Sequence, residues 1–203
     1  MNKLLNRIII SIPLFMFYYL AFKNNYIYYF YGLFVTLFSL LETFNLKKNK
    51  EIILPMIIIS NFLFFKINKY CILKIIGVIF TSDSLQLFSG KYFGQFINYK
   101  PFPKISPNKT AIGYFSGITS TLLINYYLNL FSFINCLVIL LSGIFGDLLF
   151  SYIKRCNKIK DYGFKLGGKT INILGEHGGI LDRFDSLFSS LIFYFLSQIF
   201  IVQ

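Results

Sequence analysis

Acidic residues, histidine and tryptophan are scarce or absent in this sequence. Its 203 residues include eight Asp or Glu, one His and no Trp, against 20 Lys or Arg. Charged residues of both signs amount to 14%, and 56% of the residues are hydrophobic, whereas a soluble domain carries about 25% charged residues. So few charges exclude an ordinary soluble domain, and the chain is predicted to lie in a lipid bilayer.

Cysteine is scarce as well. Cys71, Cys136 and Cys156 lie far apart and show no CxxC spacing, so the sequence indicates neither a zinc site nor a disulfide framework. The formal net charge of +12 does not point to nucleic acid, because the lysines fall in short loops between apolar runs. Lysines in such loops set the topology and attract anionic headgroups, so membrane lipid is the expected partner and nucleic acid is not.

Apolar runs recur along the chain and indicate membrane-spanning helices, each of which needs about 20 mostly apolar residues. The predicted fold is an all-α, polytopic helical bundle with about seven transmembrane helices. The spans are placed at 7–23, 26–45, 51–67, 71–90, 110–128, 131–151 and 184–202. We expect residues 1–70 to form N-terminal membrane helices and residues 71–203 to form a catalytic membrane domain.

The basic residues concentrate in alternate loops, which predicts an orientation. With the N-terminus in the cytoplasm, most Lys and Arg residues lie on the cytoplasmic side, in agreement with the positive-inside rule. The two long loops, 91–109 and 152–183, then also face the cytoplasm. We expect an integral protein of a bacterial inner membrane or an organellar membrane, with an active site on the cytoplasmic side.

The few carboxylates lie on one side of the predicted bundle. Glu42 and Glu51 flank the first cytoplasmic loop, Asp83 lies inside an apolar span, and Asp147 lies near the cytoplasmic end of another. A carboxylate facing lipid at mid-bilayer costs about 2.5–3.5 kcal/mol on insertion scales. Asp83 and Asp147 are therefore either functional or paired with polar groups between helices.

Asp147 begins a spacing that brings three kinds of polar group onto one helix face. Asp147, Ser151 and Lys154 follow an i, i+4, i+7 pattern, so a carboxylate, a hydroxyl and an ammonium group lie side by side. Such a face suits a phosphate bound together with a metal ion. In the structural alternative, Lys154 or Arg155 neutralises Asp147.

The only histidine, His177, is followed by Gly178 and Gly179 and then by Asp182 and Asp185. The two aspartates lie on one helix face, and either could cap the helix that begins there. Capping does not explain the adjacent glycines, which allow backbone N–H groups to approach a ligand closely. His177 is expected to donate a hydrogen bond or contact a phosphate rather than act as a general base.

These groups together suit a hard cation and a polyphosphate. Mg²⁺ takes one or two protein carboxylates together with water and substrate oxygens, and Asp83, Asp147 and Asp182 could supply them. Basic side chains are natural partners for phosphates. Those near the carboxylates are Lys109, Lys154, Arg155, Lys158, Lys160 and Arg183.

Several motifs in chain order are similar to those of one enzyme family. They are Asp83 with Gly90-Lys-Tyr-Phe-Gly94; Ser106-Pro107-Asn-Lys109-Thr110 with Gly113; Gly146-Asp147-Leu148 ahead of Ser151; Lys154-Arg155; Lys160-Asp161-Tyr-Gly163; and Leu174-Gly175-Glu176-His177-Gly178-Gly179-Ile-Leu-Asp182-Arg183-Phe-Asp185. Across about residues 80–190, this pattern resembles the phosphatidate cytidylyltransferases.

The resemblance implies an integral membrane enzyme that joins CTP to phosphatidate with Mg²⁺ and forms CDP-diacylglycerol and pyrophosphate. The metal-site carboxylates would be Asp83, Asp147 and Asp182. The catalytic groups would be Asp147, Asp182, Lys154 and Arg155. The substrate-binding residues would be Ser106, Lys109, Thr110, Ser151, Lys160, His177, Gly178, Gly179, Arg183 and Asp185. A homodimer is left open.

The chain departs from the family pattern at three places. Residues 162–173 form an insertion, which we expect to be a flexible loop. Its Gly163, Gly168, Lys169 and Thr170 satisfy the bare P-loop pattern but lack the required βαβ context. Ile112 stands where the family commonly has Glu, and Phe150 where Glu often precedes the serine.

Three alternatives remain open from the sequence. One is a related CTP-dependent membrane enzyme that acts on another lipid, such as a CDP-archaeol synthase or a polyprenol kinase. Another is a small cation carrier, for which Asp83 and Asp147 would line the pathway but Lys109 and His177 would have no use. The third is a lipid-binding protein without activity, which the loss of Glu at 112 and the insertion would suit.

Overall fold

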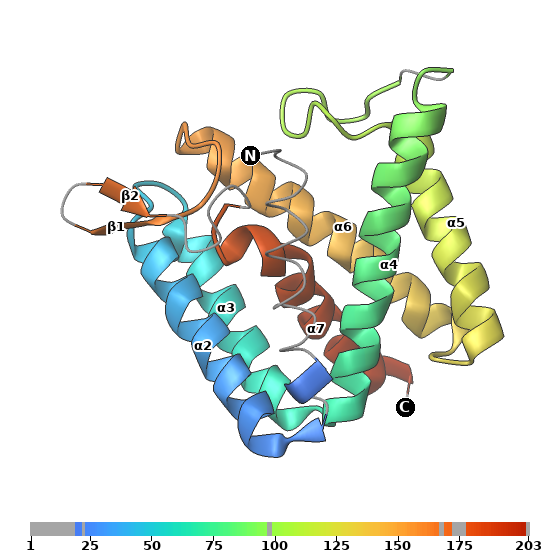
Figure 1. Ribbon diagram of the computed structural model, residues 1–203, viewed down its shortest axis with the longest axis horizontal. Helices are drawn as coiled ribbons and strands as arrows, with labels where there is room; N and C mark the ends of the chain where they lie inside the picture. The colour runs from blue at the N-terminus through green and yellow to red at the C-terminus, as the bar shows by residue number, and fades with distance from the viewer. Residues whose placement is uncertain (1–18, 22, 97–98, 167–168, 172–177, 202–203) are drawn as a thin grey trace.

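The computed structural model describes residues 19–21, 23–96, 99–166, 169–171 and 178–201. Six long helices make up most of these residues (Figure 1). They are α2 (Asn25–Phe44), α3 (Lys50–Lys66), α4 (Lys69–Phe93), α5 (Ala111–Leu128), α6 (Phe133–Cys156) and α7 (Leu181–Ile201). Each coincides with one predicted span to within a few residues, whereas most of the first predicted span, 7–23, lies outside the described residues.

Short polar side chains fix where four of the helices begin. Asn24 and Asn68 accept hydrogen bonds from the backbone N–H groups two residues on, at 2.8 and 2.9 Å, and so cap α2 and α4. Thr110 accepts from the N–H of Gly113 at 3.2 Å and caps α5. Ser132 caps α6 in the same manner. Caps of this kind satisfy N–H groups that have no partner inside the helix.

The helices pack as three antiparallel pairs. Helices α2 and α3 form one pair, α6 and α7 the central pair, and α4 and α5 the third. Figure 1 shows α7 lying between α3 and α4. Because consecutive helices run in opposite directions, α2, α4 and α6 end on the same side on which α3, α5 and α7 begin.

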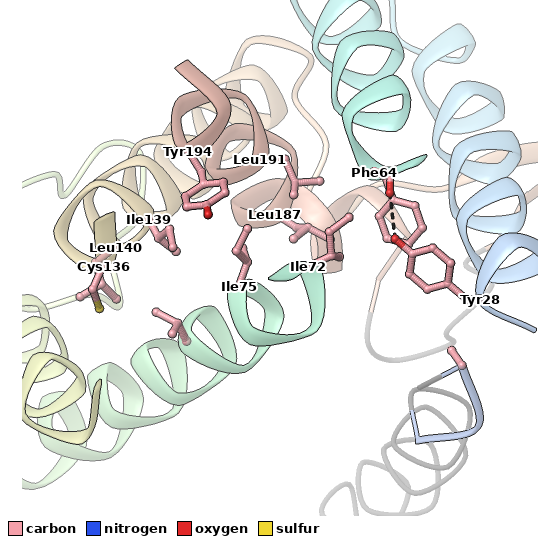
Figure 2. Close-up of a cluster of buried hydrophobic side chains, with 12 residues drawn as sticks. Tyr28, Phe64, Ile72, Ile75, Cys136, Ile139, Leu140, Leu187, Leu191 and Tyr194 are labelled. Atoms are coloured by element: carbon pink, nitrogen blue, oxygen red, sulfur yellow. Dashed lines mark hydrogen bonds between the residues drawn. The ribbon is translucent and has the colours of Figure 1, made fainter. Parts of the chain in front are cut away.

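Two clusters of buried side chains form the core. The first joins α2, α3, α4, α6 and α7 through residues such as Ile72, Ile139 and Leu191, and Figure 2 shows the Tyr28 hydroxyl donating to the Phe64 carbonyl at 2.8 Å. The second cluster lies where α6 ends and α7 begins. It consists of Val35, Leu46, Ile53, Ile57, Phe150, Ile153, Tyr162, Ile180, Leu181 and Phe188, and it supports the polar residues described below.

The outer surface is rich in exposed aromatic and aliphatic side chains, especially on α2, α4 and α5. A soluble monomer rarely exposes apolar patches of that extent, whereas lipid would cover them. Three described helices, α2, α4 and α6, are long and apolar enough to cross a membrane. The helical fold and its membrane character are thus as predicted, and the count of seven spans stays a prediction.

The insertion contains the one departure from an all-helical fold among the described residues. Strands β1 (Phe164–Leu166) and β2 (Lys169–Ile171) pair antiparallel, so the expectation of a flexible loop is wrong for this part. The same hairpin excludes a P-loop, because Lys169 and Thr170 lie in strand β2, whereas a P-loop places them at the start of a helix.

Candidate functional site

Lys109, which lies just before α5, and Asp147, in the C-terminal half of α6, form an ion pair. Their Nζ and Oδ2 atoms lie 2.5 Å apart, and both side chains are mostly buried. Burial alone would lower the pKa of Lys109, but Asp147 and Asp83 outweigh it and raise that pKa above its usual value. The Lys109 side chain is therefore a fixed positive charge at neutral pH.

A second ion pair joins Lys154 of α6 to Asp182 of α7, with 2.7 Å between Nζ and Oδ1. The structural alternative from the sequence, in which Lys154 or Arg155 neutralises Asp147, is therefore wrong. Asp147, Ser151 and Lys154 do follow one another along α6, but the lysine reaches across to α7. The spacing along one helix predicted the shared face and not the pairing between helices.

Asp182 also organises the backbone around it. Its Oδ2 atom accepts hydrogen bonds from the N–H groups of Tyr162, at 2.7 Å, and Gly179, at 3.0 Å. The Tyr162 ring is fully buried and its hydroxyl donates to the Phe150 carbonyl at 2.8 Å. Burial, together with Asp182, Asp185 and Glu42, raises the pKa of the Tyr162 phenol. Asp182 thus holds the segment before the hairpin against the start of α7.

Two further carboxylates lie close to the Lys109–Asp147 pair. Asp83 on α4 interacts electrostatically with Lys109 and Asp147, and Asp185 on α7 interacts with Asp147, Lys154 and Asp83. Asp185 is buried and accepts a hydrogen bond from the Ser186 N–H at 2.7 Å. The carboxylates of α4, α6 and α7 therefore share one region of the bundle.

These carboxylates do not converge on a single point. Within the described ranges, no three His, Cys, Asp or Glu side chains lie close enough to surround a metal ion. The predicted ligand set also included Asp182, whose two oxygens accept hydrogen bonds from Lys154, Tyr162 and Gly179. Asp185, which was predicted to bind substrate, interacts electrostatically with Asp147 and Asp83.

Glu42, which the sequence placed only beside a loop, caps α7 from a distant helix. It is fully buried, and its two carboxylate oxygens accept from the N–H groups of Ile180, at 2.8 Å, and Leu181, at 2.9 Å. A negative charge at a helix N-terminus is favourable because of the helix dipole. The predicted capping of α7 by Asp182 or Asp185 is therefore largely replaced by Glu42. No local pattern reveals this role, because the bonded residues lie 138 positions apart.

Gly178 and Gly179 are needed for the local backbone and packing, which the sequence did not indicate. Gly178 has a φ of +81°, a backbone conformation that favours glycine. A Cβ atom at Gly179 would collide with the Glu42 carboxylate, and the Gly179 N–H already donates to Asp182. The adjacent glycines thus allow the turn to fit between two carboxylates, and the Gly179 N–H is not turned toward a ligand as predicted.

Replacing Gly179 with Ala should therefore disrupt the start of α7. The added methyl group has to displace the Glu42 carboxylate, and we expect a lower unfolding temperature in detergent and a large loss of any activity of the site. The matched control is Gly77→Ala on α4, where an added Cβ meets nothing within 4 Å. Equal unfolding temperatures for the two variants would contradict the close packing of Glu42 against Gly179.

A second polar contact fixes the α2–α3 loop to the end of α6. The Asn157 Oδ1 atom accepts from the N–H groups of Lys47 and Lys48, at 3.0 and 2.9 Å, and its Nδ2 atom donates to the Lys48 carbonyl at 2.9 Å. Together with Glu42, this contact joins the predicted N-terminal segment 1–70 to the predicted catalytic segment. The division at residue 70 stays a prediction, but the two segments share the site.

The remaining predicted site residues differ in how deeply they are buried. Thr110 and Ser151 are buried, Ser106 is half-buried, and Lys160 and Arg183 are exposed. Arg155 is exposed as well, and its Nε atom donates to the Ile105 carbonyl at 3.3 Å, which ties α6 to the proline-rich loop. His177 lies outside the described residues. The structure thus brings Lys109, Thr110, Asp147, Lys154 and Asp182 together with Asp83 and Asp185.

The fold and this site define a helical membrane-type protein with paired lysines and carboxylates at the ends of its helices. The chain belongs to the Cytidylyltransferase family, whose model matches residues 8–200. It is 37% identical over 137 residues to a phosphatidate cytidylyltransferase of Aquifex aeolicus, covering 64% of this chain and 48% of that protein. It is 39% identical over 133 residues to one of Bacillus subtilis, covering 61% and 45%.

A phosphatidate cytidylyltransferase of Rickettsia bellii is 32% identical over 151 residues, which cover 66% of this chain and 61% of that protein. The matched part of these curated relatives is thus between about half and three-fifths of their length.

Proposed function

We propose that this protein is a CTP:phosphatidate cytidylyltransferase, which makes CDP-diacylglycerol and pyrophosphate for phospholipid biosynthesis. The observation that carries the proposal is the placement of Lys109 and Lys154, each paired with a carboxylate, beside Asp83 and Asp185. Positive groups that can bind a polyphosphate and negative groups that can bind a cation therefore lie in one region of a membrane-type bundle. Family membership and the names of the relatives agree with this assignment.

In the proposed reaction, a phosphate oxygen of phosphatidate forms a bond to the α-phosphorus of CTP. The bond between that phosphorus and the oxygen bridging to the β-phosphorus breaks, and its electron pair leaves with pyrophosphate. A phosphate monoester has a second pKa near 6, so the attacking oxygen is ionised at neutral pH and needs no strong general base. The protein's part is then to position both substrates and to stabilise negative charge.

Lys109 and Lys154 are the proposed phosphate-binding groups. Each ammonium already has an anionic oxygen within 2.7 Å, and charge-assisted hydrogen bonds of this type are the strong ones. Thr110 holds the start of α5 by capping, which fixes the backbone next to Lys109. Arg155 and Arg183, both exposed, would contact the outer phosphates or the lipid headgroup.

The donor set suits Mg²⁺, a hard cation that prefers oxygen ligands and keeps several waters. Asp83 makes no hydrogen bond or ion pair with another residue in the described part of the chain, so its oxygens remain available. Asp147 interacts electrostatically with Asp83, and two carboxylates are as many as Mg²⁺ usually takes from a protein. Asp182, the third predicted ligand, is held by Lys154 and the backbone. When bound, Mg²⁺ would neutralise phosphate charge at these carboxylates.

The bundle is proposed to span the membrane seven times, with the site facing the cytoplasm. The ion pairs join the C-terminal half of α6 to the starts of α5 and α7, so the site lies toward one end of the helices. The basic loops lie at the same end, and the positive-inside rule places that end in the cytoplasm. Phosphatidate in the cytoplasmic leaflet could then reach it.

The test of this proposal is pyrophosphate release by the purified full chain in liposomes. We expect release only when CTP, Mg²⁺ and phosphatidate are all present. Two other lipids, supplied in place of phosphatidate, test the related enzymes: archaetidic-type ether lipids, assayed for pyrophosphate, and polyprenols, assayed for CDP, which a kinase leaves after transfer of the γ-phosphate. Pyrophosphate release with an ether lipid, or CDP release with a polyprenol, and no product with phosphatidate would overturn the substrate assignment. Release of neither product with any lipid would favour the carrier or the inactive lipid-binding protein.

A further inference from the structure

Tyr114 carries a hydroxyl group that the proposed mechanism does not yet use. It lies in the first turn of α5, five residues after Lys109, and its backbone N–H donates to the Thr110 carbonyl as in a regular helix. Its hydroxyl oxygen is buried and has no hydrogen-bond partner among the described residues. Buried tyrosine hydroxyls normally have a partner, so this unpaired group needs an explanation.

The surroundings of Tyr114 are those of the candidate site. The Lys109 Nζ atom lies 5.5 Å from the centroid of the Tyr114 ring, and Asp147 and Asp83 interact electrostatically with the phenol. Lys109 already donates to Asp147. Tyr114 is thus a hydrogen-bond donor without an acceptor, next to the lysine proposed to bind phosphate and the carboxylates proposed to bind the cation.

We infer that the Tyr114 hydroxyl donates a hydrogen bond to a phosphate oxygen of the bound substrate. The inference rests on the proposed function and adds a substrate-contacting residue to the same site. Phosphate is the shared chemistry of both substrates, so the oxygen belongs either to the nucleotide or to the lipid. Packing alone does not account for the hydroxyl, because a phenylalanine ring would make the same contacts and leave no buried polar group unpaired.

The test is Tyr114→Phe, compared with Tyr126→Phe as the matched control. Tyr126 lies on the same helix, is 75% exposed, and loses the same hydroxyl. We expect kcat/KM of Tyr114→Phe to fall about tenfold, the size of one substrate hydrogen bond, while Tyr126→Phe stays at the wild-type value. A rise in KM for CTP alone assigns the bond to the nucleotide, and a rise for phosphatidate alone assigns it to the lipid.

A stability measurement separates this role from a structural one. Without substrate, Tyr114→Phe should unfold in detergent at the same temperature as wild type or higher, since it removes an unpaired buried polar group. A structural hydroxyl would give the opposite result, a lower unfolding temperature. Unchanged kcat/KM in Tyr114→Phe, or a lower unfolding temperature with unchanged substrate binding, would overturn the inference.

Substrate affinity is also measured directly, with CTP plus Mg²⁺ and with phosphatidate vesicles. If wild type forms no CDP-lipid, the proposed function fails, and these affinities still test the hydroxyl. Weaker binding of either ligand to Tyr114→Phe than to Tyr126→Phe supports the contact, and equal binding of both ligands contradicts it.

Discussion

Asp147→Asn should lower the rate of CDP-lipid formation by at least about 100-fold, the loss typical of removing one charge-stabilising group from an active site. The substitution keeps the size of the side chain and removes the negative charge that pairs with Lys109 at 2.5 Å. The remaining lysine is mostly buried and loses its counter-charge, so both the cation site and the phosphate site change. The measurement is the initial rate in liposomes at saturating CTP.

A loss of activity caused by unfolding has to be separated from a loss of chemistry. The double variant Lys109→Met/Asp147→Asn leaves no unpaired charge at this position, and we expect its unfolding temperature to lie closer to wild type while its activity stays absent. Glu51→Gln, an exposed acid in the first turn of α3, is the control and should keep full activity. Activity in Asp147→Asn near that of the control would remove Asp147 from the site.

Glu42→Ala should destabilise the protein by at least about 2 kcal/mol. It leaves the N–H groups of Ile180 and Leu181 buried without partners, and each such group costs about 1–3 kcal/mol. The start of α7 would move, and with it Asp182, the partner of Lys154. We therefore expect a clear fall in both the unfolding temperature in detergent and the turnover rate.

The comparison variants for Glu42 are Glu42→Gln and Glu51→Ala. The amide of Gln retains one acceptor oxygen, so its unfolding temperature should lie between wild type and Glu42→Ala. Glu51→Ala removes an exposed carboxylate from the same loop region and should have little effect. If Glu42→Ala unfolds at the same temperature as Glu51→Ala, the cap on α7 contributes nothing to stability.

The positions of the helices were predictable because hydropathy depends on local sequence. The predicted spans at 26–45 and 131–151, for example, match α2 and most of α6. The α6 helix continues to Cys156, beyond the apolar run, because Phe150 and Ile153 still face the buried cluster near α7. Hydropathy predicts the membrane-spanning part of a helix but not the polar extension beyond it.

The partners within the site were less predictable, because they depend on how distant helices pack. Asp147, Lys154 and Asp182 were expected in one site, and all three lie there, but Lys109 rather than Lys154 pairs with Asp147. The role of Glu42 could not be predicted from the sequence. Its carboxylate accepts hydrogen bonds from backbone N–H groups, which every residue except proline carries, so no side chain marks the partner. The hairpin in the insertion was missed because two strands of three residues each are too short to carry a recognisable alternation.

The fate of the CTP phosphates distinguishes cytidylyl transfer from phosphate transfer and from no reaction. The purified protein is incubated in liposomes with phosphatidate, Mg²⁺ and CTP labelled either at the α-phosphate or at the γ-phosphate. We expect the α-label to appear in a lipid product and the γ-label in pyrophosphate. Transfer of the γ-label to lipid would identify a kinase instead, and the absence of label from lipid with both forms of CTP would contradict cytidylyl transfer.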